Sequence, residues 1–234
     1  MQAPSFPPSF PPVADEWKNA DEYFSQHLLP SDPALESALE NSKQNGLPMI
    51  AVSPVQGKYL MLLLKSIQAK RVLEVGLLGG YSTIWLARGL PDDGKVVTLE
   101  VNEKFAQVAK QNIANAGLAS KVEIKLGPAA DTLKTLKPSE PFDFVFIDAD
   151  EQGNPTYFAE AKRLVRKGGV IIIDNVNIFS RVTSLPADTD DSGVQAIRKL
   201  LQDIKNDGGK EVEATVLGLA GVKGFDGMLY AVKL

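Results

Sequence analysis

Three features of the sequence predict an α/β fold with a mostly parallel sheet, helices on both of its faces and an antiparallel hairpin at the carboxyl end. Short apolar segments typical of strands alternate with segments whose apolar residues recur at helical spacing. Two strand segments, 142–149 and 169–176, are almost continuously apolar, as in the buried middle of a parallel sheet. The last two, 212–219 and 227–234, flank a glycine-rich stretch and are expected to pair antiparallel.

Composition and charge exclude several classes of function. The net charge of the 234 residues is −4 and the chain has no basic run, so neither nucleic acid nor a membrane is an expected partner. Cysteine is absent, which excludes disulfides and thiolate metal sites and weakly indicates a reducing compartment. No apolar run approaches the roughly 20 residues of a membrane span, and the first residues lack the pattern of a signal peptide. We expect a cytoplasmic protein.

The first 70 residues are expected to form a tail and three helices. Residues 1–14 are rich in proline and are expected to be extended or disordered. Ser31 is placed to cap the second helix, and Ser53 and Pro54 are placed at the N-cap and first position of the third. These helices are expected at residues 15–29, 32–46 and 53–69.

Residues 71–234 are expected to form the sheet core of a single domain that begins at residue 15. The segment 121–127 alternates apolar and polar side chains as a strand does, whereas 103–117 has an apolar face at helical spacing and ends in glycine. The strands are expected at residues 71–76, 94–101, 121–127, 142–149, 169–176, 212–219 and 227–234. The helices between them are expected at residues 80–90, 103–117, 129–137, 157–169 and 192–207.

The strand order along the chain also predicts where a ligand binds. Repeated strand–helix–strand units have right-handed crossovers, so the carboxyl ends of the parallel strands share one edge of the sheet. Ligands of such sheets bind beyond that edge. The residues that follow the strands there are Gly76–Ser82, Glu100, Gly127–Ala129, Asp148–Glu151 and Asp174–Asn175.

The stretch RVLEVGLLGGYSTIWLA predicts a nucleoside site at the first of these positions. Gly76, Gly79 and Gly80 allow close approach of the backbone where a strand turns into a helix, and Glu100 ends the next strand, where it can bind both ribose hydroxyl groups. Glu74 precedes the glycines and disfavours a pyrophosphate but suits a cationic ligand. This charge favours S-adenosylmethionine over NAD. The alternative is a tight turn that binds no ligand.

A second group of residues is acidic. Asp148 ends one apolar strand, and Asp174 and Asn175 end the next. Two carboxylates and an amide oxygen suit Mg²⁺ and could accept Mn²⁺ or Ca²⁺. Such an ion can bind two adjacent phenolic oxygens, lower the pKa of one, and hold it in line with a methyl donor. The alternative is that these residues only shape turns and cap helices.

In addition, the motifs EVGLLGGYST, TLEVN, GPA, FDFVFIDAD and GGVIIIDNV resemble the cation-dependent O-methyltransferases typified by the caffeoyl-CoA and catechol O-methyltransferases. The similarity covers roughly residues 31–234, with the motifs in the same order and at compatible spacing. It implies the Rossmann-like, seven-stranded sheet of class I methyltransferases, S-adenosylmethionine as the donor, a divalent cation and a homodimer.

The resemblance also implies roles for individual residues. Glu74 would lie near the methionine end of the donor and Ser82 would bind its carboxylate. Glu100 would hold the ribose, and the backbone of Ala129 would contact the adenine. The other donor contacts would come from Val52, Gly76, Gly80 and Asp148. The metal ligands would be Asp148, Asp174 and Asn175.

The general base is the point at which this chain departs from the family. The family commonly has a lysine three residues after the first metal-binding aspartate, whereas this chain has Glu151. Three possibilities stay open at the sequence level. Glu151 is the base next to Asp148, the ion alone acidifies the acceptor, or another residue such as His27, the only histidine, serves instead. Glu151 and His27 could equally be surface or packing residues.

The segment 176–191 is expected to border the acceptor, which Phe179 and Arg181 could contact. It lacks the tryptophan often found there in the family. We therefore expect in-line methyl transfer to a hydroxyl group of a catechol-like or phenylpropanoid molecule. The alternatives are a cation-independent methyltransferase, an NAD-dependent oxidoreductase, and a non-catalytic protein that binds S-adenosylmethionine.

Overall fold

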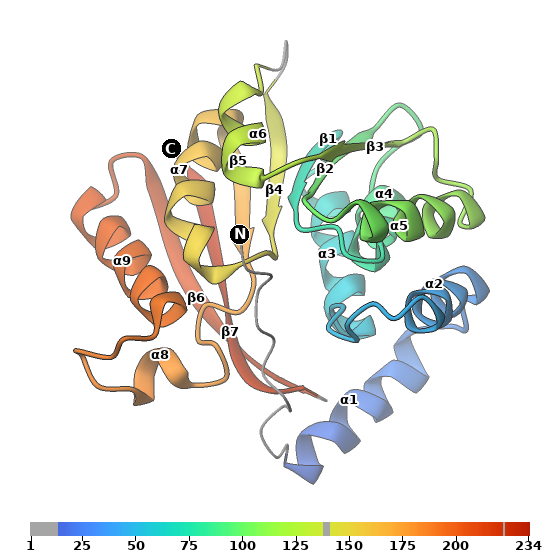
Figure 1. Ribbon diagram of the computed structural model, residues 1–234, viewed down its shortest axis with the longest axis horizontal. Coiled ribbons are helices and arrows are strands. Elements are labelled where there is room, and N and C mark those ends of the chain that lie inside the picture. Colours follow the sequence, from blue (N-terminus) through green and yellow to red (C-terminus); the bar gives the residue numbers. More distant parts are fainter. Residues whose placement is uncertain (1–13, 138–140, 222) are drawn as a thin grey trace.

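The computed structural model describes residues 14–137, 141–221 and 223–234, and contains one seven-stranded sheet (Figure 1). The strand order is β3-β2-β1-β4-β5-β7-β6. The first five strands are parallel, and β7 pairs antiparallel with both β5 and β6, which confirms the predicted fold class. The strands are β1 (Arg71–Val75), β2 (Lys95–Glu100), β3 (Val122–Leu126), β4 (Phe142–Ile147), β5 (Val165–Ile173), β6 (Val212–Gly221) and β7 (Gly224–Lys233).

Helices cover both faces of the sheet (Figure 1). On one face Val72, Phe144 and Ile172 pack against α2, α3, α4 and α5. Val75 and Ile147 point to the opposite face, which α6, α7 and α9 cover. The helices are α1 (Asp15–Leu28), α2 (Pro33–Gln44), α3 (Pro54–Ser66), α4 (Tyr81–Gly89), α5 (Glu103–Asn115), α6 (Ala129–Thr135), α7 (Asn154–Leu164), α8 (Arg181–Ser184), α9 (Ser192–Asp207) and the 3₁₀ helix η1 (Glu151–Gly153). None of the helices in these described ranges is long and apolar enough to cross a membrane.

The helix starts follow the expected capping chemistry with one correction. Asp32, and not Ser31, caps α2, because its carboxylate accepts hydrogen bonds from the N–H groups of Ala34 and Leu35. A carboxylate can satisfy two such donors, and the Ser31 hydroxyl instead donates to a glutamate further along the helix. Ser53 caps α3 as predicted. The expectation for the first 13 residues lies outside the described part of the chain.

Two segments differ from their predicted structure. The expected helix at 157–169 begins earlier, at Asn154, and ends at Leu164, because the next five residues already belong to β5 and shift its pairing with β4. The glycine-rich stretch 220–227 is mostly strand, since β6 runs to Gly221 and β7 starts at Gly224. The short helices η1 and α8 were not predicted. Both lie in loops after the carboxyl ends of the central strands.

Candidate functional site

The predicted site residues converge because the central strands end in register at one edge of the sheet. Val75, Ile147 and Ile173 are partners across β1, β4 and β5. The N–H group of Asp148 donates to the carbonyl of Val75, and the N–H group of Asp174 donates to the carbonyl of Ile147. The two aspartates therefore lie on neighbouring strand ends, as the sequence predicted.

Gly76 brings the loop after β1 against the end of β4. Its φ is 101°, and a Cβ at this position would lie 1.9 Å from the carbonyl oxygen of Asp148. Only glycine fits, because the backbone that a side chain would meet cannot move aside. The sequence predicted that the backbone at Gly76 approaches a ligand. In the structure it approaches the backbone of Asp148. It joins the predicted nucleoside loop to the acidic residues.

Glu74 lies at the end of β1 and is fully buried. Its carboxylate accepts hydrogen bonds from the hydroxyl groups of Ser82 (2.7 Å), Thr83 (2.6 Å) and Thr98 (2.6 Å). Burial raises the pKa of Glu74 to about 7, although the three hydroxyl groups act in the opposite direction. The Ser82 hydroxyl donates its hydrogen bond to Glu74, so it is not available as a donor to a ligand. What Ser82 offers an anionic ligand is its backbone N–H group in the first turn of α4.

Glu100 shapes the same loop from the end of β2. One carboxylate oxygen accepts the N–H group of Leu78 at 2.9 Å, and the other accepts those of Val101 (2.9 Å) and Asn102 (2.8 Å). Gly80 ends the loop in the left-handed region, with a φ of 79°, and forms the N-cap of α4. Glu100 is thus held in one orientation at the carboxyl edge of the sheet, and its contact with a ribose stays a prediction.

Val52 and Ala129 are the two remaining predicted donor contacts. Val52 is buried in the segment that leads into α3, and Ala129 is the partly exposed first residue of α6. The loop before Ala129 is tied to β2, because the N–H group of Gly127 donates to the carbonyl of Glu100 at 2.8 Å. Ala129 therefore borders the carboxyl end of β2, and the contacts of both residues with a ligand stay predictions.

Asp148 and Asp174 form the centre of the acidic half of the site. Burial raises the pKa of both carboxyl groups, repulsion from Asp174 raises that of Asp148 further, and repulsion from Asp226 adds to that of Asp174. The side-chain N–H of Gln56 in α3 donates to Asp174 at 2.7 Å, and the N–H group of Asn175 donates to its other oxygen at 3.0 Å. These bonds do not neutralise two adjacent carboxylates, so the pair favours a cation.

The donor set at this point fits a hard divalent cation. In the described ranges no three His, Cys, Asp or Glu side chains group together in a metal-binding arrangement, so any third ligand beside the two aspartates would be of another kind. Asn175 follows Asp174 with a φ of 57°. Its side-chain nitrogen donates to Asp226 at 3.2 Å, which leaves its amide oxygen for another partner. Two carboxylates and an amide oxygen are ligands that Mg²⁺ accepts.

Glu151 lies in η1, close to the acidic pair. It is half-buried and packs against Gly193 in the first turn of α9. A Cβ added to Gly193 would lie 3.4 Å from the Cβ of Glu151. Burial raises the pKa of Glu151, and repulsion from Asp150 and Asp226 adds to the increase. The charge of Glu151 in turn raises the pKa of Asp148. The structure therefore brings Glu151 into the electrostatic field of the predicted metal ligands.

Lys223 is a positively charged residue at this site that the sequence reasoning missed. It lies at the tip of the β6–β7 hairpin, and its ammonium group donates to the carbonyls of Ile50 (2.9 Å) and Ala51, just before Val52. Burial lowers the pKa of Lys223, and the charges of two carboxylates, Asp148 and Asp174, act against this. The hairpin tip thus connects the segment before α3 to the acidic half of the site.

The residues expected to border the acceptor are held by the protein. The N–H group of Phe179 donates to Asp226 at 3.2 Å. The guanidinium of Arg181 pairs with Asp191, which caps α9. His27 lies exposed on α1, and its ring bonds to the carbonyl of Tyr23 at 2.7 Å. Arg181 is therefore already paired, and His27 has the surface role that the sequence left open.

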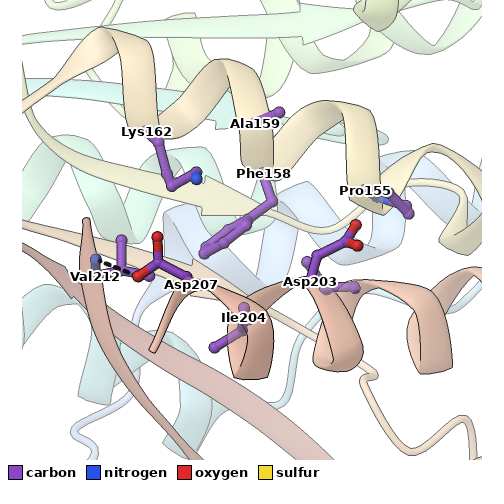
Figure 2. A pocket seen from close by; sticks show the side chains of 9 residues that line it. Pro155, Phe158, Ala159, Lys162, Asp203, Ile204, Asp207 and Val212 are labelled. Atoms are coloured by element: carbon purple, nitrogen blue, oxygen red, sulfur yellow. Dashed lines mark hydrogen bonds between the residues drawn. The ribbon is translucent and has the colours of Figure 1, made fainter. Parts of the chain in front are cut away.

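A hollow of about 100 Å³ lies apart from these residues, between α7, α9 and the start of β6 (Figure 2). Its charged groups have partners in the protein: Lys162 pairs with Glu211, and Asp207 accepts hydrogen bonds from three backbone N–H groups, including that of Val212. It contains none of the predicted site residues, and nothing in its lining calls for a ligand. The residues that line it are Pro155, Phe158, Ala159, Lys162, Leu200, Asp203, Ile204, Asp207 and Val212.

Three residues join the site without having been predicted: Gln56, Lys223 and Asp226. A signal existed for Gln56, since it lies in the first turn of α3, four residues after Val52, a predicted donor contact. Lys223 and Asp226 lie in the glycine-rich stretch, whose composition indicates a loop. Their position follows from the pairing of β7 with β5, which brings the hairpin tip to the carboxyl end of β5. Spacing along the chain alone does not show this.

Comparisons with known proteins agree with the resemblance to O-methyltransferases. Residues 25–234 match the family model described as O-methyltransferase. The chain is 48% identical to a catechol O-methyltransferase of Mycobacterium tuberculosis, over 92% of this chain and 94% of that protein.

Two solved structures are also similar. The O-methyltransferase of Bacillus cereus in complex with SAH is 45% identical, with a TM-score of 0.90, over 94% of this chain and 99% of that one. The O-methyltransferase TomG of Streptomyces achromogenes, involved in tomaymycin synthesis and solved in complex with SAM, is 43% identical, with a TM-score of 0.88, over 94% and 97% of the two chains. The chain therefore belongs to the O-methyltransferase family of enzymes.

Proposed function

We propose that this O-methyltransferase transfers a methyl group from S-adenosylmethionine to a hydroxyl group of a catechol-like or phenylpropanoid molecule, assisted by a divalent cation. One observation carries the proposal. Gly76 of the predicted nucleoside loop touches the backbone of Asp148, and Asp148 in turn lies beside Asp174. A donor bound at the loop and an acceptor held at the acidic pair would therefore be neighbours, as direct transfer requires.

The donor assignment has support from the chain and from its relatives. The negative charge of Glu74 disfavours the pyrophosphate of a dinucleotide. Glu100 is fixed by backbone N–H groups at the strand end where a ribose is expected. The similar structures from Bacillus cereus and Streptomyces achromogenes were solved with SAH and SAM. The acceptor class is supported by the similar Mycobacterium tuberculosis protein, which is named a catechol O-methyltransferase.

The cation would be held by Asp148, Asp174 and Asn175, with Mg²⁺ the first candidate and Mn²⁺ or Ca²⁺ the others. When bound, it would lower the pKa of an acceptor hydroxyl group and orient the acceptor. The chain supplies the ligands' orientation: Gln56 fixes one oxygen of Asp174, and Asp226 fixes the amide nitrogen of Asn175. These partners are of the kind that supports metal ligands in known sites.

In the proposed reaction the ionised acceptor oxygen forms a bond to the methyl carbon while the bond from that carbon to sulfur breaks, leaving S-adenosylhomocysteine. The positive sulfonium and the negative oxygen both lose their charge, so exclusion of water favours the transfer. The hydroxyl proton goes to a carboxylate. Glu151 is our candidate, because burial and the charges of Asp150 and Asp226 raise its pKa and make it a better base.

A second candidate function is transfer without a metal ion. It is favoured by Lys223, which already places a positive charge beside Asp148 and Asp174. Lys223 could orient an ionised acceptor by charge alone. The two candidates differ in their response to loss of a carboxylate, since a lysine-assisted reaction does not need both aspartates as ligands.

We also propose a homodimer. Helix α1 has no buried residue and presents exposed aromatic and aliphatic side chains: Tyr23, Phe24 and Leu28 are 58, 52 and 67% exposed. It packs beside the hairpin (Figure 1). The rings of Trp17 in α1 and Phe225 in β7 lie 6.3 Å apart. The hairpin adds Val216, Leu217 and Phe225, which are 44, 42 and 41% exposed. Apolar surface on both α1 and the hairpin suits a second copy of the chain.

The proposal is tested with Asp148→Asn and Asp174→Asn in a transfer assay that uses labelled S-adenosylmethionine and catechol. Loss of a ligand carboxylate should abolish transfer by either variant, while Asp174→Asn, which changes no predicted donor contact, still binds S-adenosylhomocysteine. Asp143→Asn is the matched control, because Asp143 is also a partly buried acid of β4 but lies at the opposite end of that strand. Full transfer by Asp174→Asn would contradict the metal-assisted reaction and leave the second candidate.

A further inference from the structure

Asp226 is a buried carboxylate near the start of β7 that no predicted role accounts for. It is 7% exposed and accepts four hydrogen bonds. One comes from the side-chain nitrogen of Asn175 (3.2 Å), and three come from the backbone N–H groups of Asn177 (3.0 Å), Phe179 (3.2 Å) and Gly227 (2.7 Å). Three of the four donors belong to the loop that follows β5. Asp226 therefore connects the hairpin to the loop that carries the third predicted metal ligand.

The contact between Asp226 and Asn175 has a chemical consequence. An ionised carboxylate only accepts hydrogen bonds, whereas an amide side chain has one end that donates and one that accepts. The amide of Asn175 must therefore turn its nitrogen to Asp226, which leaves its oxygen at the other end of the amide. An oxygen is the atom that a hard cation binds, and a nitrogen donor would repel it. Asp226 thus selects the productive orientation of Asn175.

The hydrogen bonds from backbone N–H groups to Asp226 also fix the loop that carries Asn175. Four residues of this loop have left-handed backbone conformations without being glycine: Asn175, Ile178, Phe179 and Ser180, with φ between 47° and 70°. Such conformations cost free energy and persist only where the surroundings hold them. Asn177 and Phe179, whose backbone N–H groups donate to Asp226, lie within this stretch. The carboxylate therefore holds the loop as well as the amide.

We propose that Asp226 is a positioning residue that orients the Asn175 amide oxygen and the following loop toward the cation and the acceptor. The inference rests on the proposed function, because it assigns Asn175 as a metal ligand. Asp226 itself does not bind the ion, since the backbone and Asn175 donors occupy its carboxylate. Loss of its charge should weaken metal binding and leave donor binding intact.

The test measures binding and not turnover. Mn²⁺ affinity, followed by the electron paramagnetic resonance of the free ion, and S-adenosylhomocysteine affinity, followed by calorimetry, are compared for the wild type and for Asp226→Asn. An asparagine at 226 can donate as well as accept, so it no longer selects the amide orientation. We expect Mn²⁺ affinity to fall about 10- to 100-fold, the range found for partners of metal ligands. S-adenosylhomocysteine affinity should stay the same.

Two further variants keep the test decisive. Asn175→Ala removes the oriented amide and keeps the backbone N–H groups that donate to Asp226, so it should show the same loss of Mn²⁺ affinity. Asp143→Asn is the matched control, since Asp143 accepts from the N–H groups of Lys70 and Arg71 and from Arg166, and lies far from this edge of the sheet. It should bind Mn²⁺ as the wild type does.

The outcomes separate the inference from the proposed function. If Asp174→Asn and Asn175→Ala weaken Mn²⁺ binding but Asp226→Asn binds as the wild type does, the inference is overturned and the metal site stands. If Asp174→Asn leaves Mn²⁺ binding unchanged, the metal-assisted reaction is overturned, and the inference falls with it. Loss of Mn²⁺ affinity in Asp226→Asn and Asn175→Ala, with unchanged S-adenosylhomocysteine affinity, supports both.

Discussion

At the scale of single residues, the site is built from acids in different environments. Glu74 is fully buried and accepts hydrogen bonds from three hydroxyl groups, Asp226 accepts hydrogen bonds from backbone N–H groups, and Asp148 and Asp174 repel each other. Environment, and not residue type, therefore decides which acid serves structure and which is free to bind a cation.

Glu74 gives a pH-dependence that can be measured. Its pKa is about 7 in the folded protein, whereas in the unfolded chain it should be near 4.5. The folded state therefore keeps a proton that the unfolded state has lost, so the free energy of unfolding should fall as pH rises from about 4.5 to about 7. The loss amounts to about 3 kcal/mol.

Glu74→Gln tests this contribution, because glutamine fills the same space without titrating and its amide can donate to the Ser82 hydroxyl. Chemical denaturation at several pH values between about 4.5 and about 7.5 should show a flatter pH-dependence for the variant than for the wild type. Parallel curves for the two proteins would show that Glu74 does not titrate in this range.

At the scale of elements, the β6–β7 hairpin has a larger role than its sequence indicates. Its tip carries Lys223, which binds the carbonyls of Ile50 and Ala51, and Asp226, which binds the loop after β5. The hairpin thus reaches both the segment that contains Val52 and the loop that contains Asn175. Its antiparallel pairing with β5 puts these contacts at the carboxyl edge of the sheet.

Lys223→Met should loosen the segment before α3. Loss of the charge-assisted hydrogen bonds to Ile50 and Ala51 should weaken binding of S-adenosylhomocysteine about tenfold, which corresponds to about 1.4 kcal/mol. Mn²⁺ binding should not weaken, because the removed charge is positive and lies beside the acidic pair. Calorimetric titration with each ligand measures both effects.

Lys233→Met is the matched control for this variant. Lys233 belongs to the same hairpin and also donates to a backbone carbonyl, that of Val165, but it does so at the other end of β7. It should bind S-adenosylhomocysteine as the wild type does. Equal affinities for the Lys223 and Lys233 variants would show that the hairpin tip does not support donor binding.

At the scale of the whole molecule, the sequence predicted the fold and the meeting of Asp148 and Asp174 at one edge of the sheet for a physical reason. Parallel strands are marked by apolar runs, and their carboxyl ends must meet at one edge, so the pattern of the chain alone places Asp148 and Asp174 together. It does not place Lys223 and Asp226, because hairpin pairing brings them there from the last twelve residues. The glycines at 221 and 224 indicate a loop, although glycine also allows close pairing of strands.

The proposed dimer is a prediction at this scale as well. Light scattering after gel filtration should give twice the mass of the chain for the wild type. Phe24→Asp combined with Leu28→Asp should give the mass of one chain, because charges on the exposed face of α1 oppose burial of that face. Leu126→Asp is the control, since Leu126 is 53% exposed on β3 at the opposite edge of the sheet. A monomeric wild type would contradict the proposal.

The most direct test of the central claim is methyl transfer with and without a divalent ion. The protein is treated with EDTA, the chelator is removed, and labelled S-adenosylmethionine and catechol are added while Mg²⁺ is titrated back. We predict transfer at background level without the ion and recovery on titration, with Asp174→Asn inactive throughout. Full transfer by the metal-depleted protein would contradict the claim that Asp148, Asp174 and Asn175 hold a cation needed for the reaction.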